Sequence, residues 1–283
     1  MTPDDAFETS DAEADALARC FAMLAIRAGA LAMEIFAAPQ IESRMKGDSS
    51  PVTEADERVE EFLLSELERA LPGVPRLAEE SAARGARLRE SDAFLLIDPV
   101  DGTREFLARS PEFTINVALA EKGAPRIGAV YAPAQERLWF AGARGFETRA
   151  APGGALPAAQ DFQPLRARRR PADGLVALVS KSHLDPETKE FLAREPVARS
   201  LAIGSSLKFC LLARGEADVY PRFGPTMEWD TAAGDAVLRA AGGATLTPNG
   251  APLLYGKSGQ GYRNGPFIAW ADPASISSSA TLP

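Results

Sequence analysis

The chain has 283 residues, of which 46% are hydrophobic and 25% are charged. This composition is typical of a globular protein with a large core and excludes a mainly disordered chain. The 39 Asp and Glu residues outnumber the 31 Lys and Arg residues, for a formal net charge of −8. An acidic chain is poorly suited to non-specific nucleic-acid binding, although metal ions could supply positive charge locally to a phosphate-bearing ligand.

Few residues are available for sulfur or imidazole chemistry. The chain contains two cysteines, Cys20 and Cys210, and one histidine, His183. Without a C-x-x-C motif, neither a disulfide framework nor a thiolate zinc site is expected. Residues 1–15 lack the apolar segment of a signal peptide. The longest apolar run, residues 20–36, is interrupted by two charged side chains, so we expect no membrane-spanning helix and a cytoplasmic location.

The first half of the chain combines helical periodicity with short apolar runs. The expected elements are helices over 17–35 and 53–71 and strands over 94–97, 113–120, 126–131 and 138–141. Turn residues separate the strands, which favours an antiparallel meander. We expect Pro99 to end the first of these strands. Residues 1–150 are therefore predicted to form an α+β half in which paired helices pack on a mostly antiparallel sheet.

The second half shows a different pattern. Residues 151–173 are rich in Ala, Pro, Gly and Arg without an apolar period, and we expect a linker or mobile surface segment there. Helices and strands then alternate, which predicts an α/β half over 174–283. Its expected strands are 175–179, 197–203, 217–220, 244–246 and 267–269, and its expected helices are 186–193, 206–214 and 231–241.

The most informative motif is D-P-V-D-G-T at residues 98–103, directly after a buried strand. Gly102 permits a tight turn, so Asp98 and Asp101 are expected to lie close together with the Val100 carbonyl between them. Two carboxylates and a carbonyl are hard oxygen ligands that suit Mg²⁺. On spacing alone, an ordinary polar turn remains the simpler interpretation.

Three further acidic sites also stand at the edges of predicted elements. Each has an ordinary structural explanation: Glu79-Glu80 as a solvated dipeptide, Asp230 as a helix N-cap, and Asp56 as part of a capping box with Thr53. Together with residues 98–103 they make four acidic sites in a chain without histidine or cysteine clusters. Each signal is weak alone, and the structural explanations stay open at this point.

These motifs resemble, in order and approximate spacing, those of the lithium-sensitive, magnesium-dependent phosphatase superfamily that includes the inositol monophosphatases. The matching stretches are Lys46 with S-P-V-T-E-A-D at 50–56, E-E-S at 79–81, D-P-V-D-G-T at 98–103 and W-D-T-A-A-G at 229–234. The resemblance covers roughly residues 10 to 270. It implies an α/β (α+β) fold, a layered αβαβα sandwich.

Further stretches resemble the bacterial 3′(2′),5′-bisphosphate nucleotidase branch of that superfamily. They are D-G-T-R-E-F at 101–106, with Arg104 in place of Lys, S-K-S-H at 180–183, G-S-S-L-K-F-C at 204–210 and Y-P-R-F-G-P-T at 220–226. The resemblance implies hydrolysis of the 3′-phosphate of adenosine 3′,5′-bisphosphate (PAP) to AMP and phosphate in sulfur assimilation, with PAPS as a further substrate. An inositol-monophosphatase-like or sugar-phosphate phosphatase is the alternative enzyme, and a PAP-binding regulator is the alternative outside enzymes.

The resemblance also assigns roles. It implies two or three Mg²⁺ ions per site, held by Glu79, Asp98, Val100, Asp101 and Asp230. Glu79 is preferred to Glu80 because the first acid of the family's E-E-S is the ligand. Asp56 and Thr103 match the family's pair that activates water. The residues expected to bind substrate are Glu79, Val100, Asp101, Gly102, Thr103, Ser180, His183, Gly204, Lys208 and Asp230.

The expected partners are correspondingly few. We expect a small nucleotide as substrate, no nucleic acid and no integral membrane segment. Arginines 166, 168, 169 and 170 leave peripheral contact with a membrane open, although a solvated loop is the simpler interpretation of that cluster. The sequence leaves monomer and homodimer open.

Overall fold

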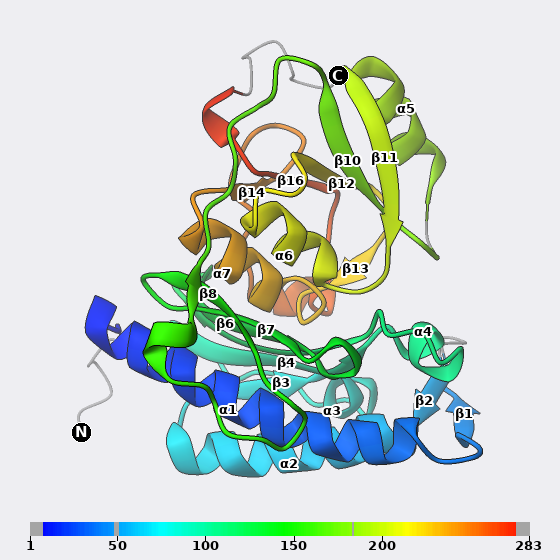
Figure 1. Ribbon diagram of the computed structural model, residues 1–283. Helices are drawn as coiled ribbons and strands as arrows, with labels where there is room; N and C mark the ends of the chain where they lie inside the picture. Colours follow the sequence, from blue (N-terminus) through cyan, green and yellow to red (C-terminus); the bar gives the residue numbers. More distant parts are fainter. Residues whose placement is uncertain (1–7, 48–50, 183, 276–283) are drawn as a thin grey trace.

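The computed structural model describes residues 8–47, 51–182 and 184–275, which form five stacked layers (Figure 1). Helices α1 (Asp11–Phe36) and α2 (Glu54–Ala70) form the first layer and a seven-stranded sheet the second. Helices α6 (Leu207–Ala213) and α7 (Ala232–Ala240) form the middle layer. A five-stranded sheet and helix α5 (Pro186–Arg194) complete the stack. The expected αβαβα sandwich is confirmed.

The seven-stranded sheet has the order β3-β4-β5-β6-β7-β8-β9. All neighbouring strands are antiparallel except β3 and β4, which run parallel. The strands are β3 (Arg76–Ala78), β4 (Ala93–Asp101), β5 (Thr114–Glu121), β6 (Ala124–Ala132), β7 (Arg137–Ala141), β8 (Gly145–Arg149) and β9 (Gln163–Pro164). The predicted meander thus forms the centre of this sheet.

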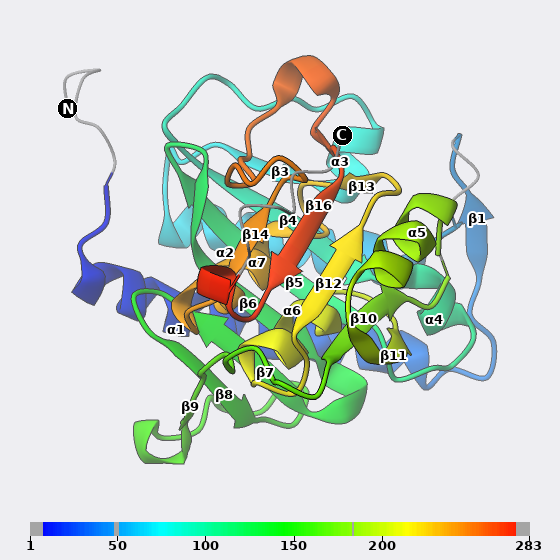
Figure 2. The ribbon, with the colours of Figure 1, turned by 90° about the horizontal axis from the view of Figure 1, so that it is seen from above.

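The five-stranded sheet has the order β11-β10-β12-β16-β14, seen from above in Figure 2. Its strands are β10 (Leu175–Ser180), β11 (Val197–Ile203), β12 (Val219–Arg222), β14 (Ala244–Leu246) and β16 (Phe267–Trp270). Strands β10, β11 and β12 are parallel, and β16 runs antiparallel to both of its neighbours. The alternation of helices and strands predicted for this half is confirmed.

Several short elements surround the sheets. Two small strand pairs join β1 (Ser43–Met45) to β2 (Pro51–Thr53) and β13 (Thr226–Met227) to β15 (Arg263–Asn264). The remaining short elements are α3 (Glu79–Ala83), α4 (Thr103–Leu107) and the 3₁₀ turns Pro133–Gln135, Ala159–Asp161, Ser258–Gln260 and Pro273–Ser275. None of these was predicted, because elements of two to five residues carry too little periodicity to be recognised.

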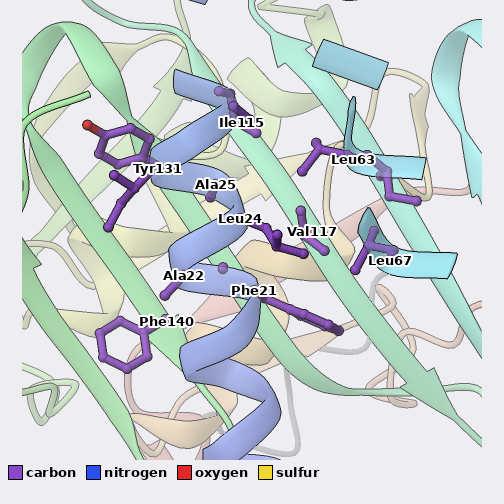
Figure 3. Packing of buried hydrophobic residues seen from close by; sticks show 14 of the residues in the cluster. Phe21, Ala22, Leu24, Ala25, Leu63, Leu67, Ile115, Val117, Tyr131 and Phe140 are labelled. Atoms are coloured by element: carbon purple, nitrogen blue, oxygen red, sulfur yellow. The ribbon is translucent and has the colours of Figure 1, made fainter. Parts of the chain in front are cut away.

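Helix α1 is long and apolar enough to cross a membrane by length and composition, the one such helix in the described part of the chain. Figure 3 shows why it is apolar: Phe21 and Leu24 lie against the seven-stranded sheet. Beside them, the buried Tyr131 donates a hydrogen bond to the Ala150 carbonyl (2.8 Å). The apolar residues of α1 are therefore accounted for by the protein core.

Our expectation that Pro99 ends a strand was wrong. Strand β4 continues to Asp101, and its register against β5 shifts between Asp98 and Asp101. The irregularity leaves residues 99 and 100 out of the ladder, so the missing amide hydrogen of proline costs no pairing with β5. The strand therefore carries both aspartates instead of stopping before the second.

Residues 151–173, where a linker or mobile segment was expected, are held at several points. Strand β9 pairs with β8, and the buried Phe162 packs edge-on against Phe140 with ring centroids 5.0 Å apart. Arg168 forms two hydrogen bonds of 2.6 and 2.7 Å to the buried Asp218. The arginine cluster is thus partly engaged within the protein, which weakens its interpretation as a membrane contact.

Close packing between the sheet and the middle layer yields a stability prediction. A Cβ at Gly128 of β6 would lie 2.4 Å from the Ala233 carbonyl oxygen of α7. Gly128→Ala must therefore push α7 away, and we expect the free energy of unfolding to fall by ~1–3 kcal/mol. Urea denaturation measures the change. Gly259→Ala, where a Cβ meets no atom within 4 Å, is the matched control; equal stability of the two variants would contradict the prediction.

Candidate active site

A cavity of about 480 Å³ lies where the two halves of the chain meet. The N-terminal half contributes the end of β4, the start of α4 and Glu79 of α3. The C-terminal half contributes the end of β10, the start of α6 and the residues around Asp230. The cavity therefore draws together acidic residues that are far apart in the sequence.

The turn at residues 98–103 presents its oxygen atoms to this cavity. Asp98 is buried and its Oδ1 accepts a hydrogen bond from the Val100 amide (3.1 Å), which fixes the carboxylate beside the turn. Gly102 has φ = +96°, and a Cβ there would meet the Glu112 carbonyl oxygen at 3.2 Å. This position favours glycine, which lets the chain turn from β4 into α4 directly after Asp101.

Asp101 is held by the C-terminal half of the molecule. Its Oδ2 accepts hydrogen bonds from the Ser206 amide (2.6 Å) and hydroxyl (2.7 Å), with Asn116 Nδ2 at 3.3 Å. Within the described residues Oδ1 has no hydrogen-bond donor. Ser206 also lies 2.7 Å from the Asp230 carbonyl oxygen, so this one side chain connects the acids of both halves.

The carboxylates repel one another in a buried environment. Burial is the main cause that raises the pKa of Asp98 well above its usual range, and Glu79, Asp101 and Asp230 raise it further. Burial likewise raises the pKa of Asp230, with Asp101 and Glu79 as the next causes. These three aspartates and Glu79 line the same cavity. A divalent cation among them would relieve the repulsion.

Glu79 and Glu80 occupy different environments. Glu79 lines the cavity, whereas Glu80 does not and has its backbone amide bonded to the buried Glu60 (2.7 Å). The Lys46 ammonium binds both glutamates, at 2.6 Å from Glu79 and 2.5 Å from Glu80. The placement of Glu79 favours it over its neighbour as a metal ligand.

Thr103 lines the cavity and lies close to Asp56, which is buried and does not line it. Asp56 Oδ2 accepts bonds from the Thr53 amide (2.7 Å) and hydroxyl (2.6 Å), which is the capping box expected at the start of α2. Asp56 Oδ1 lies 3.3 Å from Thr103 Oγ1, which is also 3.3 Å from the Val100 carbonyl oxygen. The cap therefore leaves one carboxylate oxygen for Thr103, and the structural and catalytic roles of Asp56 are compatible.

Burial raises the pKa of Asp56 to about 6, and the two bonds from Thr53 oppose that rise. An acid with this pKa is largely ionised at neutral pH and can accept a proton. Asp56 thus has the chemistry of a general base that acts through Thr103.

Every described residue that was expected to bind substrate lines the cavity. Ser180, Gly204 and Lys208 line it, while His183 lies outside the described residues. The buried Lys208 Nζ donates to the carbonyls of Ile203 (3.2 Å) and Ser205 (2.5 Å). Because an ammonium has three donors, one remains for a ligand in the cavity.

Sequence reasoning missed three residues that support the site. Ser206 lay within a quoted motif, but nothing indicated that it would bond Asp101, 105 positions away. Glu60 reads as an ordinary surface helix residue, although it accepts bonds from the Glu80 amide and the Ser81 hydroxyl. Arg263 gave no signal at all, yet it lines the cavity.

The proposed donor set of four carboxylates and a carbonyl oxygen lines one cavity, and such hard oxygen donors fit a divalent cation. Among residues 8–47, 51–182 and 184–275, no three Asp, Glu, His or Cys side chains already form a tight coordination group. The acids thus share the cavity, and a bound cation would have to draw them closer together.

Comparisons with known proteins identify the family of the chain. The model of the inositol monophosphatase family matches residues 13–271. The chain is 40% identical to "3′(2′),5′-bisphosphate nucleotidase CysQ" of Escherichia coli O157:H7 over 82% of this chain and 91% of that protein, and 34% identical to the CysQ of Buchnera aphidicola over 88% and 91%.

Solved structures give the same result. CysQ from Bacteroides thetaiotaomicron, described as a bacterial member of the inositol monophosphatase family, superimposes with a TM-score of 0.74 at 34% identity, covering 90% of this chain and 96% of that one. An IMPase from Thermotoga maritima shares the fold, with a TM-score of 0.69 at 23% identity over 91% and 92% of the two chains. The chain belongs to the inositol monophosphatase family.

Proposed function

We propose that this chain is a metal-dependent phosphoric monoester hydrolase that removes the 3′-phosphate of PAP, giving AMP and phosphate, and that it also accepts PAPS. The observation that carries the proposal is a single cavity that combines the family's acidic residues with Lys208 and Ser180 of the nucleotidase-like motifs. The similarity to CysQ proteins supports the choice of a nucleotide over an inositol phosphate. We place the reaction in the cytoplasm, as part of sulfur assimilation.

The proposed metal ligands are Glu79, Asp98, the Val100 carbonyl, Asp101 and Asp230. We propose two or three Mg²⁺ ions, which suit hard oxygen donors. Bound there, they would neutralise the phosphate and stabilise charge on the leaving oxygen. Four carboxylates contribute about four negative charges, so two divalent ions balance them and an acidic protein can accept a polyanion.

Thr103 and Asp56 then act on the attacking water. The Thr103 hydroxyl accepts a hydrogen bond from the water and donates its own hydrogen to Asp56 Oδ1, which lies 3.3 Å away. As the water oxygen bonds to phosphorus, its proton moves to Thr103 and the threonine proton to Asp56. The P–O bond to the ribose 3′-oxygen breaks, and that oxygen takes up a proton from solvent water. The amides of Gly102 and Thr103 are proposed to hold phosphate oxygens.

A substrate panel tests this proposal. Purified protein with Mg²⁺ is assayed for phosphate release from PAP, PAPS, inositol 1-phosphate and fructose 1,6-bisphosphate. We expect the largest kcat/KM for PAP. A preference for inositol 1-phosphate or the sugar bisphosphate would overturn the nucleotide assignment, and tight PAP binding without phosphate release would indicate a regulator.

Metal binding should show in stability without any assay of turnover. Since Asp98 and Asp230 have raised pKa values, the folded state holds more protons than the unfolded state above pH ~4, and stability in EDTA should fall as the pH rises. Saturating Mg²⁺ at 100 times its Kd should restore about 2.7 kcal/mol at pH 8. Thermal melts at pH 5 and 8 measure this; identical melts with EDTA and Mg²⁺ would exclude the metal centre.

Asp101→Asn and Asp230→Asn should abolish turnover while the fold is retained. Each removes one charge from the proposed metal set, and each amide keeps an oxygen that can accept the existing hydrogen bonds. Turnover at saturating Mg²⁺ and circular dichroism measure the two effects. Asp161→Asn, on an exposed turn, is the matched control. Near-wild-type kcat in either cavity variant would show that the assignment is wrong.

Thr103→Ala should lower kcat by roughly 10²–10⁴ with little effect on KM, the usual contribution of a positioned base. In the wild type, kcat/KM should rise from acidic pH and level off above about 6, because Asp56 must lose its proton to act. Asp56→Asn should remove that acid limb along with most of the activity. A Thr103→Ala effect confined to KM would instead assign Thr103 to binding.

Lys208→Ala should lower kcat/KM for PAP by roughly tenfold to a hundredfold, the value of a charged hydrogen bond to the 5′-phosphate. Hydrolysis of 3′-AMP, which lacks that group, should hardly change. Because Lys208 also bonds two backbone carbonyls, circular dichroism of the variant serves as the folding control. Equal loss on both substrates would mean that Lys208 supports the metal centre or the fold.

A further inference from the structure

Four cationic side chains line the cavity: Arg104, Lys208, Arg222 and Arg263. Lys208 donates to two backbone carbonyls, and Arg222 donates to the carbonyls of Gly224 (3.2 Å) and Pro225 (3.0 Å). Arg104 also interacts with the protein. Arg263 differs, because it is exposed and its side chain has no hydrogen bond or ion pair with any of the described residues. Its guanidinium therefore keeps all its donors for a ligand.

The backbone that carries Arg263 is fixed on both sides. Its neighbours Tyr262 and Asn264 are 1% and 3% exposed. Asn264 Nδ2 donates to the Met227 carbonyl (3.0 Å) and to Thr231 Oγ1 (3.0 Å). Successive side chains of a strand point to opposite sides, so the anchored Asn264 leaves Arg263 facing the other way. The structure thus holds the backbone of Arg263 while its side chain stays exposed.

Arg263 also stands next to the acids of the site. It is the register partner of Met227, whose amide donates to Asp230 Oδ2 (2.8 Å). One strand pair therefore connects the guanidinium to a proposed metal ligand. Arg263 and the acids therefore line the same cavity.

We propose that Arg263 binds the second anionic group of the substrate, the 5′-phosphate, and so determines specificity for bisphosphorylated nucleotides. This inference rests on the proposed function. A guanidinium presents a planar fork of donors that matches phosphate oxygens in pairs. Arg263 has all its donors available, whereas Lys208 has one, so the exposed arginine provides the outer contact and the buried lysine the inner one.

The test compares PAP with 3′-AMP in the Mg²⁺-loaded enzyme. Arg263→Ala should raise KM for PAP by roughly tenfold to a hundredfold with kcat unchanged, because it removes binding that ground state and transition state share. KM for 3′-AMP should stay the same. Arg263→Lys should recover part of the loss, since it keeps the charge without the fork. Arg199→Ala, an exposed arginine of β11 outside the cavity lining, should match the wild type on both substrates.

Equal losses on PAP and 3′-AMP, or a loss in kcat alone, would overturn the assignment. Failure of the proposed function is separate: it would appear as wild-type protein that does not hydrolyse PAP. In that case, the role of Arg263 is still tested by calorimetric measurement of the binding of AMP, which carries only the 5′-phosphate. Weaker AMP binding by Arg263→Ala than by the wild type supports the inference, and equal binding refutes it.

Discussion

The mutual repulsion of buried carboxylates is the constraint on which this site depends. The buried Asp98 shares one cavity with Glu79, Asp101 and Asp230, and these three acids raise its pKa. Like charges at low dielectric are costly, so such a cluster persists only if the surrounding fold holds it together. A divalent cation bound at the proposed site would offset this cost.

The scaffold holds these acids mostly through neutral donors. Ser206 bonds Asp101, the Val100 amide bonds Asp98, and the Met227 amide bonds Asp230. Neutral donors fix the position of a carboxylate without neutralising its charge, which stays available to a metal. The exception is Glu79, which is bound by the Lys46 ammonium. A metal ligated by Glu79 must therefore share that carboxylate with Lys46 or displace it.

Local sequence patterns predicted the layers of the fold. The features that they did not predict depend on contacts between residues far apart in the sequence. The periodicity of residues 17–35 and the D-P-V-D-G-T motif carried enough information for helix α1 and the acidic turn. The continuation of β4 through Pro99 could not be predicted, because it depends on a register shift against β5. Ser206 and Arg263 were missed for the same reason: their significance arises from partners or surfaces formed by distant parts of the chain.

The distribution of positive charge in the cavity completes this account. A chain with a net charge of −8 repels a polyanion at a distance, so attraction has to arise inside the cavity. Arg222 and Lys208 donate hydrogen bonds to backbone carbonyls and so help to hold the cavity lining in place. Because these two side chains are already held in place, they lose little conformational entropy when a ligand binds. They also have fewer donors left for that ligand. Arg263 has an anchored backbone and a side chain whose donors are all unused. For that reason we expect substitutions at Arg263 to change specificity for the 5′-phosphate more readily than substitutions at the buried cations.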